Sequence, residues 1–272
     1  MTVRNFSLTA LPVTHSVWGA SRQVVFCDFD GPIVDVSERY YQTYLKGLLA
    51  VEQLYEEQII KHYQEPKISP KARAEALSKA EFWELKQNRT ADIEIMLRSG
   101  LASELHQPFM QQIERMVNHP SLLRLDRVQP SAQAALHYMK GNGLRLVLVT
   151  LRHPRQVEDF LQTHQLAHLI DQVYGVADLN AAQANRVEQK CALLATAIAQ
   201  QTAQGHRVTG SWMIGDTEAD VLAGQAMNLS TAALSCGIRS AAYLKALQPS
   251  KLYGGLLSAA GKVVASAMLQ AA

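Results

Sequence analysis

Residues 23–31 are QVVFCDFDG, a short apolar run that ends in two aspartates and a glycine. The apolar side chains follow one another without the polar alternation of a half-exposed strand. This pattern predicts a strand that is covered on both faces, as in a parallel sheet. Because the acidic residues come directly after that strand, this single stretch bears on both the fold and the chemistry of the chain.

The rest of the chain after residue 126 alternates between apolar runs and segments of helical pattern. Alternation of this kind specifies a parallel sheet, and right-handed crossovers place helices on both of its faces. The sequence therefore predicts an α/β fold with a doubly wound, Rossmann-like parallel sheet. Further strands are expected at 144–150, 172–175, 211–214 and 230–234, and helices at 130–143, 154–164, 186–203 and 217–227 and from Ser240 and Gly255.

Residues 37–126 interrupt this alternation, because nothing there has the pattern of a strand. Tyrosines and leucines recur at helical spacing from Ser37 onward, and Ser69 with Pro70 has the pattern of a helix start. Further helices are expected at 80–85, 91–97 and 107–117. We expect an inserted all-α cap domain at 37–126, a catalytic core made of 21–36 and 127–272, and an N-terminal extension at 1–20.

Composition and charge limit the classes of partner. The 272 residues are 48% hydrophobic and 18% charged, which is typical of a globular protein. Lys and Arg number 26 against 24 Asp and Glu, with no long run of one sign. Nucleic acid and anionic membranes attract basic patches, so neither is an expected partner. We expect a small-molecule partner.

The cysteines and the two chain ends indicate a cytoplasmic protein. Cys27, Cys191 and Cys236 are widely separated and lack the spacing of a metal site, so we expect reduced thiols. The N-terminal segment is a poor signal peptide. The apolar run at 256–272 is rich in small residues and contains Lys262, which favours a docked helix over a membrane span.

Polar side chains follow the expected carboxyl ends of the strands. Ligands bind at this edge of open α/β sheets because loops and helix N-termini converge there. We therefore expect these groups to face one crevice. The candidates are Asp28, Asp30, Thr150, Asp216 and Asp220, together with Lys190 near the start of a helix.

These residue types together favour phosphoryl chemistry with a divalent metal. Crowded carboxylates repel one another unless a cation lies among them, and oxygen-only ligands suit Mg²⁺. Thr150 and Lys190 supply the donor and the positive charge that a phosphoryl group needs. Of Asp28 and Asp30, one carboxylate is suited to attack phosphorus and the other to handle protons.

In this order, the motifs resemble those of the haloacid dehalogenase superfamily of hydrolases. They are DxDG at 28–31, a threonine that ends a strand at 150, Lys190 ahead of an apolar helix, and GDxxxD at 215–220. The insert after the first motif resembles the helical-cap phosphatase subtype, which includes phosphoglycolate phosphatase-like enzymes. Members of that subtype mostly act on small phosphorylated metabolites.

The resemblance implies a Mg²⁺-dependent phosphatase that works through an aspartyl-phosphate. Asp28 would be the nucleophile and Asp30 the acid and base, and a carboxylate at 30 is absent from true dehalogenases of the superfamily. The implied metal ligands are Asp28, Asp30 through its backbone, Asp216 and Asp220, and the implied phosphoryl ligands are Thr150 and Lys190.

Alternatives remain open for the function and for several side chains. The same core would serve a phosphosugar mutase, and a catalytically silent metabolite-binding protein would share the fold. Arg152 and His153 either contact substrate or lie in solvent. Tyr40, Tyr41 and Tyr44 either line a substrate pocket or pack between helices. The histidines show no zinc-ligand spacing.

Overall fold

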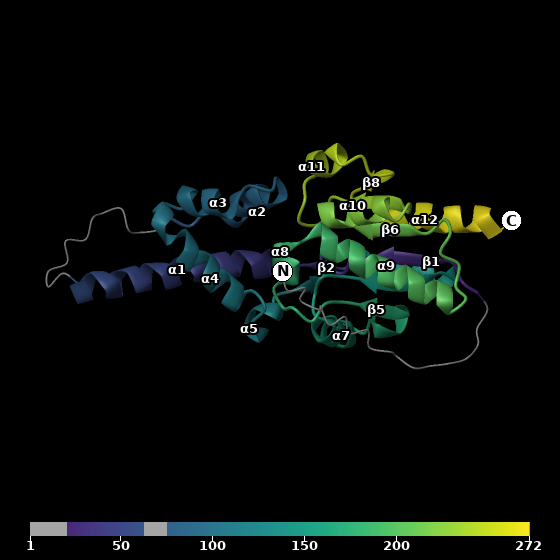
Figure 1. Cartoon of the computed structure of the whole chain (residues 1–272), viewed down its shortest axis with the longest axis horizontal. Coiled ribbons are helices and arrows are strands. Elements are labelled where there is room, and N and C mark those ends of the chain that lie inside the picture. The colour runs from purple at the N-terminus through teal and green to yellow at the C-terminus, as the bar shows by residue number, and fades with distance from the viewer. Residues whose placement is uncertain (1–20, 63–74, 272) are drawn as a thin grey trace, which may run out of the picture. The chain divides into compact units, whose positions relative to one another are not determined.

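The computed structural model describes residues 21–271 except 63–74 (Figure 1). The expected extension at 1–20 and the expected helix start at Ser69 and Pro70 lie outside the described residues. The chain divides into two compact units. Residues 36–126 form the cap unit, and the residues on either side of it form the core unit.

The core unit is built on a six-stranded sheet with the strand order β5-β4-β1-β6-β7-β8. Every pair of neighbouring strands is parallel. The first strand, β1, lies in the middle of the sheet. The next strands, β4 and β5, lead to one edge, and β6, β7 and β8 lead to the other, so the sheet is doubly wound as predicted. The strands are β1 (Val24–Cys27), β4 (Arg145–Val149), β5 (Gln172–Tyr174), β6 (Trp212–Gly215), β7 (Ser230–Leu234) and β8 (Lys251–Tyr253).

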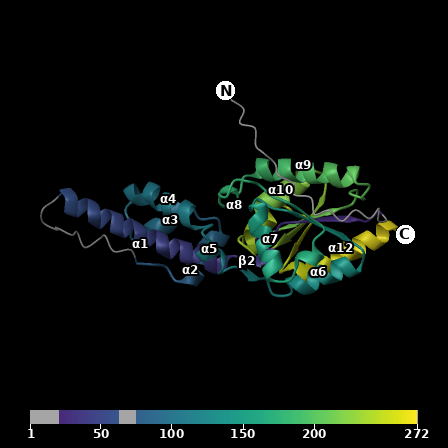
Figure 2. The same ribbon diagram turned by 90° about the horizontal axis from the view of Figure 1, so that it is seen from below.

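Helices cover both faces of this sheet, as Figure 2 shows. α6 (Ala132–Gly141) and α12 (Leu256–Ala271) pack together on one face, and α9 (Val187–Ala203) and α10 (Glu218–Ala226) pack together on the other. The side chains of β1 are all buried, which explains the continuous apolar run in its sequence. The shorter helices of the core unit are α7 (Pro154–Thr163), η3 (Ala167–Leu169), α8 (Ala181–Ala184) and α11 (Ala241–Ala246).

Three short strands were not predicted. β8 extends the sheet beyond β7, and β2 (Val34–Asp35) pairs antiparallel with β3 (Arg127–Val128) in a separate two-stranded sheet. Strands of two or three residues are too short to show a periodic pattern. The β2-β3 pair lies where the chain leaves the core unit and where it returns.

The cap unit is helical throughout its described residues. Tyr44, Phe82, Met96 and Phe109 form the centre of its apolar core. Gly47 lets α1 and α4 approach, because a Cβ there would lie 2.8 Å from Ile113 Cδ1. The helices are α1 (Ser37–His62), α2 (Lys79–Gln87), α3 (Asp92–Arg98), η2 (Ser103–Leu105), α4 (His106–Met116) and α5 (Pro120–Leu123).

A buried ion pair joins the two ends of the cap unit. Arg39 Nε lies 2.8 Å from Asp126 Oδ1, and both side chains are withdrawn from solvent. Arg39 also donates to the carbonyl oxygen of Val117 at 3.3 Å. The inserted segment therefore closes on itself within its own fold.

Several side chains take a packing role. Tyr44 is buried in the cap core, where its hydroxyl lies 2.6 Å from Ser99 Oγ, so it is a packing residue. His153 accepts a hydrogen bond from the backbone of Arg155 and caps the start of α7.

The cysteines form no disulfide. Within the described chain, no helix has the length and apolarity needed to cross a membrane.

Candidate active site

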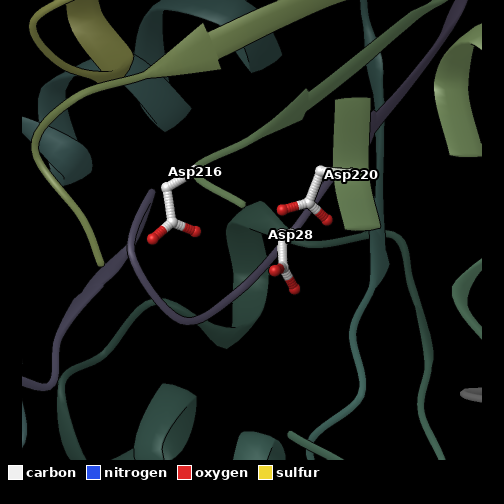
Figure 3. A group of neighbouring side chains, drawn as sticks. All are labelled: Asp28, Asp216 and Asp220. Carbon is white, nitrogen blue, oxygen red and sulfur yellow. The ribbon is translucent and has the colours of Figure 1, made fainter. Parts of the chain in front are cut away.

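Three buried carboxylates lie beside one another at the carboxyl edge of the sheet (Figure 3). Asp28 follows β1 and Asp216 follows the neighbouring strand β6, while Asp220 lies in the first turn of α10. The register pairs Cys27 with Ile214, so the residues after the two strands start at the same level. One oxygen from each carboxylate lies within 4.8 Å of the others.

Lys190 bridges two of these carboxylates. Its Nζ lies 2.9 Å from Asp28 Oδ1 and 2.7 Å from Asp220 Oδ1. The side chain is only 1% exposed, although a lysine on an amphipathic helix is usually solvated. The first turn of α9 thus delivers an ammonium group to the cluster.

Asp220 is held by the start of its own helix. Its Oδ2 accepts hydrogen bonds from the Thr217 backbone N–H at 3.0 Å and from the Thr217 hydroxyl at 2.8 Å. These contacts form a capping box, which fixes the first turn of α10. With Oδ1 on Lys190, both oxygens of Asp220 have partners, so this carboxylate orients the ammonium group.

Asp216 is enclosed by two glycines. A Cβ at Gly31 or at Gly237 would overlap the Asp216 carboxylate, so only glycine leaves room for it. Asp216 Oδ2 accepts a hydrogen bond from the Ile238 N–H at 2.6 Å. Its Oδ1 is buried and has no hydrogen-bond partner among the described residues. A buried carboxylate oxygen in that state needs a cation or a donor.

The electrostatics of the cluster favour a divalent cation. Burial, followed by repulsion from Asp220, raises the pKa of Asp28. Burial and repulsion from Asp220 and Asp28 raise the pKa of Asp216 well above its ordinary value. Burial lowers the pKa of Lys190, but attraction by Asp220 and Asp28 outweighs it and the pKa is raised. The cluster carries excess negative charge, and its oxygen donors suit Mg²⁺.

Asp30 lies outside this cluster of three and contacts Arg152. Arg152 Nη1 lies 2.8 Å from Asp30 Oδ1, and the Arg152 side chain is 3% exposed. Of the two alternatives for Arg152, the solvated one is therefore wrong. Thr150 is buried at the end of β4, where its Oγ1 accepts the Arg152 backbone N–H at 3.2 Å.

The structure adds a loop that the motifs do not indicate. Residues 235–239 follow β7 and contribute Gly237 and the Ile238 N–H beside Asp216. Arg239 makes a bidentate ion pair with the buried Glu218, at 2.7 Å and 3.1 Å. The strand-end rule applied to 230–234 would have found this loop, but a backbone N–H has no sequence signature.

Known proteins share this fold. The family model described as haloacid dehalogenase-like hydrolase matches residues 24–234. No curated protein sequence matches the chain.

Solved structures resemble the chain over most of its length. A predicted phosphatase from Clostridium acetobutylicum has 16% identity and a TM-score of 0.59, with 90% of this chain and 100% of that chain covered. A haloacid dehalogenase-like hydrolase from Streptococcus pneumoniae has 16% identity and a TM-score of 0.56, with 89% and 98% covered. A predicted phosphoglycolate phosphatase from Haemophilus somnus has 15% identity and a TM-score of 0.53, with 88% and 96% covered. At these identities the likeness concerns the fold.

Proposed function

We propose, from the premise that this chain belongs to the haloacid dehalogenase-like hydrolases, that it is a Mg²⁺-dependent phosphatase. It hydrolyses a small phosphomonoester through an aspartyl-phosphate, the acyl phosphate formed on the Asp28 carboxylate. The observation that carries the proposal is the buried cluster of Asp28, Asp216 and Asp220, in which Lys190 bridges Asp28 and Asp220. A cluster of this kind is costly to fold and is suited to binding a cation and a phosphoryl group.

The proposed metal ligands are Asp28, Asp216 and the backbone carbonyl of Asp30, with Asp220 in support. The partnerless Oδ1 of Asp216 favours this assignment. These residues would hold Mg²⁺, which when bound would supply positive charge against the carboxylates and the phosphoryl oxygens. Asp220 acts chiefly by holding Lys190, because both of its oxygens already have partners.

The first step transfers the phosphoryl group to the protein. An oxygen of Asp28 attacks phosphorus, and the bond between phosphorus and the leaving oxygen breaks. Asp30 in its acid form gives its proton to that oxygen, so the alcohol leaves neutral. Thr150 and Lys190 hold the phosphoryl oxygens during the transfer. In this step the Lys190 ammonium group keeps its contact with Asp220 and donates another N–H to a phosphoryl oxygen.

The second step returns Asp28 to its starting state. Asp30, now a carboxylate, takes a proton from water, and the oxygen of that water attacks phosphorus. The bond between phosphorus and the Asp28 oxygen breaks, inorganic phosphate leaves, and Asp28 is again a carboxylate. One water is consumed for each ester hydrolysed.

The proposed substrate class is a small phosphorylated metabolite. The family resemblance and a fold neighbour described as a predicted phosphoglycolate phosphatase support it. The net charge of only +2, with no long run of basic residues, favours a small ligand over nucleic acid. We assign the cap unit a role in selecting the ester rather than in the chemistry, because inserted domains and loops of enzymes often control access to the site.

Trapping the phosphorylated protein tests the chemistry. Asp30→Asn should lower turnover on the order of a hundredfold to ten-thousandfold, because proton transfer contributes about that much. With p-nitrophenyl phosphate, whose leaving group needs little protonation, the second step becomes slow and phosphate accumulates on Asp28. Mass spectrometry of acid-quenched protein locates it. Asp159→Asn on the exposed side of α7 is the matched control and should turn over normally.

A panel of phosphomonoesters separates the alternatives. Release of inorganic phosphate supports the phosphatase, whereas return of the phosphoryl group to a second hydroxyl of a phosphosugar indicates a mutase. Binding without turnover across the panel indicates a silent metabolite-binding protein. Phosphate on a residue other than Asp28 contradicts the assignment of the nucleophile.

Removal of the metal is the second test. A chelator should abolish turnover and Mg²⁺ should restore it, while Ca²⁺ should support little turnover because its larger shell disturbs the in-line geometry. Full turnover in the presence of chelator contradicts the metal assignment and leaves the trapping result to stand by itself.

A further inference from the structure

We propose that Arg152 is the positioning residue for Asp30. Its guanidinium holds the carboxyl group in the one orientation that serves both proton transfers. The inference rests on the proposed function, because it concerns the residue that acts there as acid and base. Arg152 would act through Asp30 and not on the substrate itself.

The first argument is the ion pair. Arg152 Nη1 lies 2.8 Å from Asp30 Oδ1, with 3% of the arginine side chain and 18% of the aspartate side chain exposed. Ion pairs in solvent contribute little because water competes and both side chains move. Here the guanidinium is withdrawn from water while the carboxylate stays reachable. That difference suits a fixed support beneath a group that must meet substrate and water.

The second argument is the pair of aromatic rings, Phe29 and Phe160, next to the guanidinium. Arg152 Cζ lies 5.4 Å from the centroid of the Phe29 ring, within the range of a cation-π contact. Phe29 is fully buried and meets the Phe160 ring edge-on, with centroids 5.4 Å apart and an interplanar angle of 87°. The residue between Asp28 and Asp30 thus packs under the arginine that holds Asp30.

The third argument is the backbone around Arg152. Its N–H donates to Thr150 Oγ1 at 3.2 Å, and its carbonyl oxygen accepts the Val176 N–H at 3.4 Å. Gly175 closes in on the same carbonyl, since a Cβ there would lie 2.6 Å from the Arg152 oxygen. The turn after β4 is therefore clamped by the segment after β5. The guanidinium projects from a fixed point.

These contacts carry a catalytic consequence. An acid and base must first reach the leaving oxygen and then the attacking water, so its orientation limits both steps. Displacement of a reacting group by about 1 Å costs on the order of a hundredfold in rate. Removing the guanidinium should therefore lower kcat far more than it changes KM.

A double-mutant cycle tests the coupling. Arg152→Met, Asp30→Asn and the double variant are compared with the wild-type protein on an alkyl phosphomonoester with Mg²⁺. Arg152→Met should lower kcat about ten- to a hundredfold in the wild-type background and less than about twofold in the Asp30→Asn background. Arg152→Lys, which keeps the charge without the planar fork, should recover part of the loss.

Arg207→Met is the matched control. Arg207 donates to Gln23 Oε1 at 2.6 Å at the opposite edge of the sheet, so its loss should leave kcat unchanged. A crystal structure of Arg152→Met reports on Asp30 without any assay, and it should show the carboxyl group turned from its present orientation.

Three results would overturn the inference. An equal loss of kcat in both backgrounds means that Arg152 acts independently of Asp30. A raised KM with normal kcat makes Arg152 a substrate-binding residue. An unmoved Asp30 in the variant structure removes the positioning role. If Arg152→Met does not fold, Arg152→Lys takes its place in the cycle. Absence of turnover in the wild-type protein counts against the proposed function, while the crystal structure still decides whether Arg152 fixes Asp30.

Discussion

The two edges of the central sheet carry opposite balances of charge. At the carboxyl edge, Lys190 contacts Asp28 and Asp220, and Asp216 lies beside them. At the amino edge, one carboxylate, Asp171, accepts Arg22 and Lys140 at 2.6 Å each, with Arg145 Nη1 at 3.6 Å. Carboxylates exceed their cation at the first edge, and cations exceed their carboxylate at the second.

The pKa values of the two edges move in opposite directions. Burial tends to raise the pKa of Asp171, but hydrogen bonds from Lys140, the Leu146 N–H and Arg22 outweigh it, and the pKa is lowered. At the other edge burial and repulsion raise the pKa of Asp28. One edge is satisfied by the chain itself and stabilises the fold. The other keeps an excess of carboxylates among the described residues, as the proposed metal site requires.

The largest expected effects come from one substitution at each edge. The substitution at the carboxyl edge should lower turnover, and the one at the amino edge should lower stability. Asp28→Asn should lower turnover by at least on the order of ten-thousandfold, because the proposed nucleophile is lost. Without metal its free energy of unfolding should not fall, because a crowded carboxylate is removed. Asp171→Asn should keep turnover and lose about 2 kcal/mol of stability, because three cations lose their partner.

Steady-state assays and urea unfolding measure both quantities. Loss of turnover in Asp171→Asn, or unfolding of Asp28→Asn, would show that the two edges do not divide function and stability in this way.

A smaller effect is expected from the loop beside Asp216. Gly237→Ala places a Cβ on the Asp216 carboxylate, so the side chain must turn. Asp216 is a proposed metal ligand, and changes beside a metal ligand typically cost about ten- to a hundredfold in metal affinity. A titration of turnover against Mg²⁺ should show that shift. Gly254→Ala, where a Cβ meets nothing within 4 Å, is the control and should leave the titration unchanged.

The smallest effect is a difference in pH dependence. The pKa of Asp28 rises from 3.8 to about 7 on folding, so between these values the folded protein binds more protons there than the unfolded chain does. Without metal, stability should therefore fall as pH rises through this window. The lowered pKa of Asp171 acts with the opposite sign, because its stabilisation is lost as pH falls through its folded pKa.

Urea unfolding from pH 4 to pH 7.5, with and without Mg²⁺, separates the two contributions. Asp28→Asn should flatten the decline at rising pH, and Asp171→Asn should remove stability most at neutral pH. An identical slope in Asp28→Asn and the wild-type protein would contradict the first expectation.

Much of the fold follows from local sequence, because strands buried on both faces must be apolar throughout. The apolar runs at 24–27 and 146–149 therefore predict β1 and β4 directly, and the strand-end rule places Asp28 and Asp216 at one edge. The roles assigned to the site residues stay predictions until variants are assayed.

The contact between Arg152 and Asp30 could not be predicted from the sequence, because a charged residue after a strand is usually solvated. Arg152 lies over the Phe29 ring, which meets Phe160 of α7, so its surroundings come from segments far apart in the sequence. The Ile238 N–H was equally hidden, because every residue but proline has one and only the path of the loop aims it at Asp216.

The ion pair between Arg39 and Asp126 makes the inserted segment an exchangeable module. The ion pair joins the two ends of the segment within the cap unit. The β2-β3 pair joins the chain on the core side, just before the segment begins and just after it ends. The entropy of closing a loop grows only slowly with its length, so the core is little affected by what lies between β2 and β3. Another helical insert with its own closing ion pair can therefore replace residues 36–126, Arg39 and Asp126 included, while the six-stranded sheet stays unchanged.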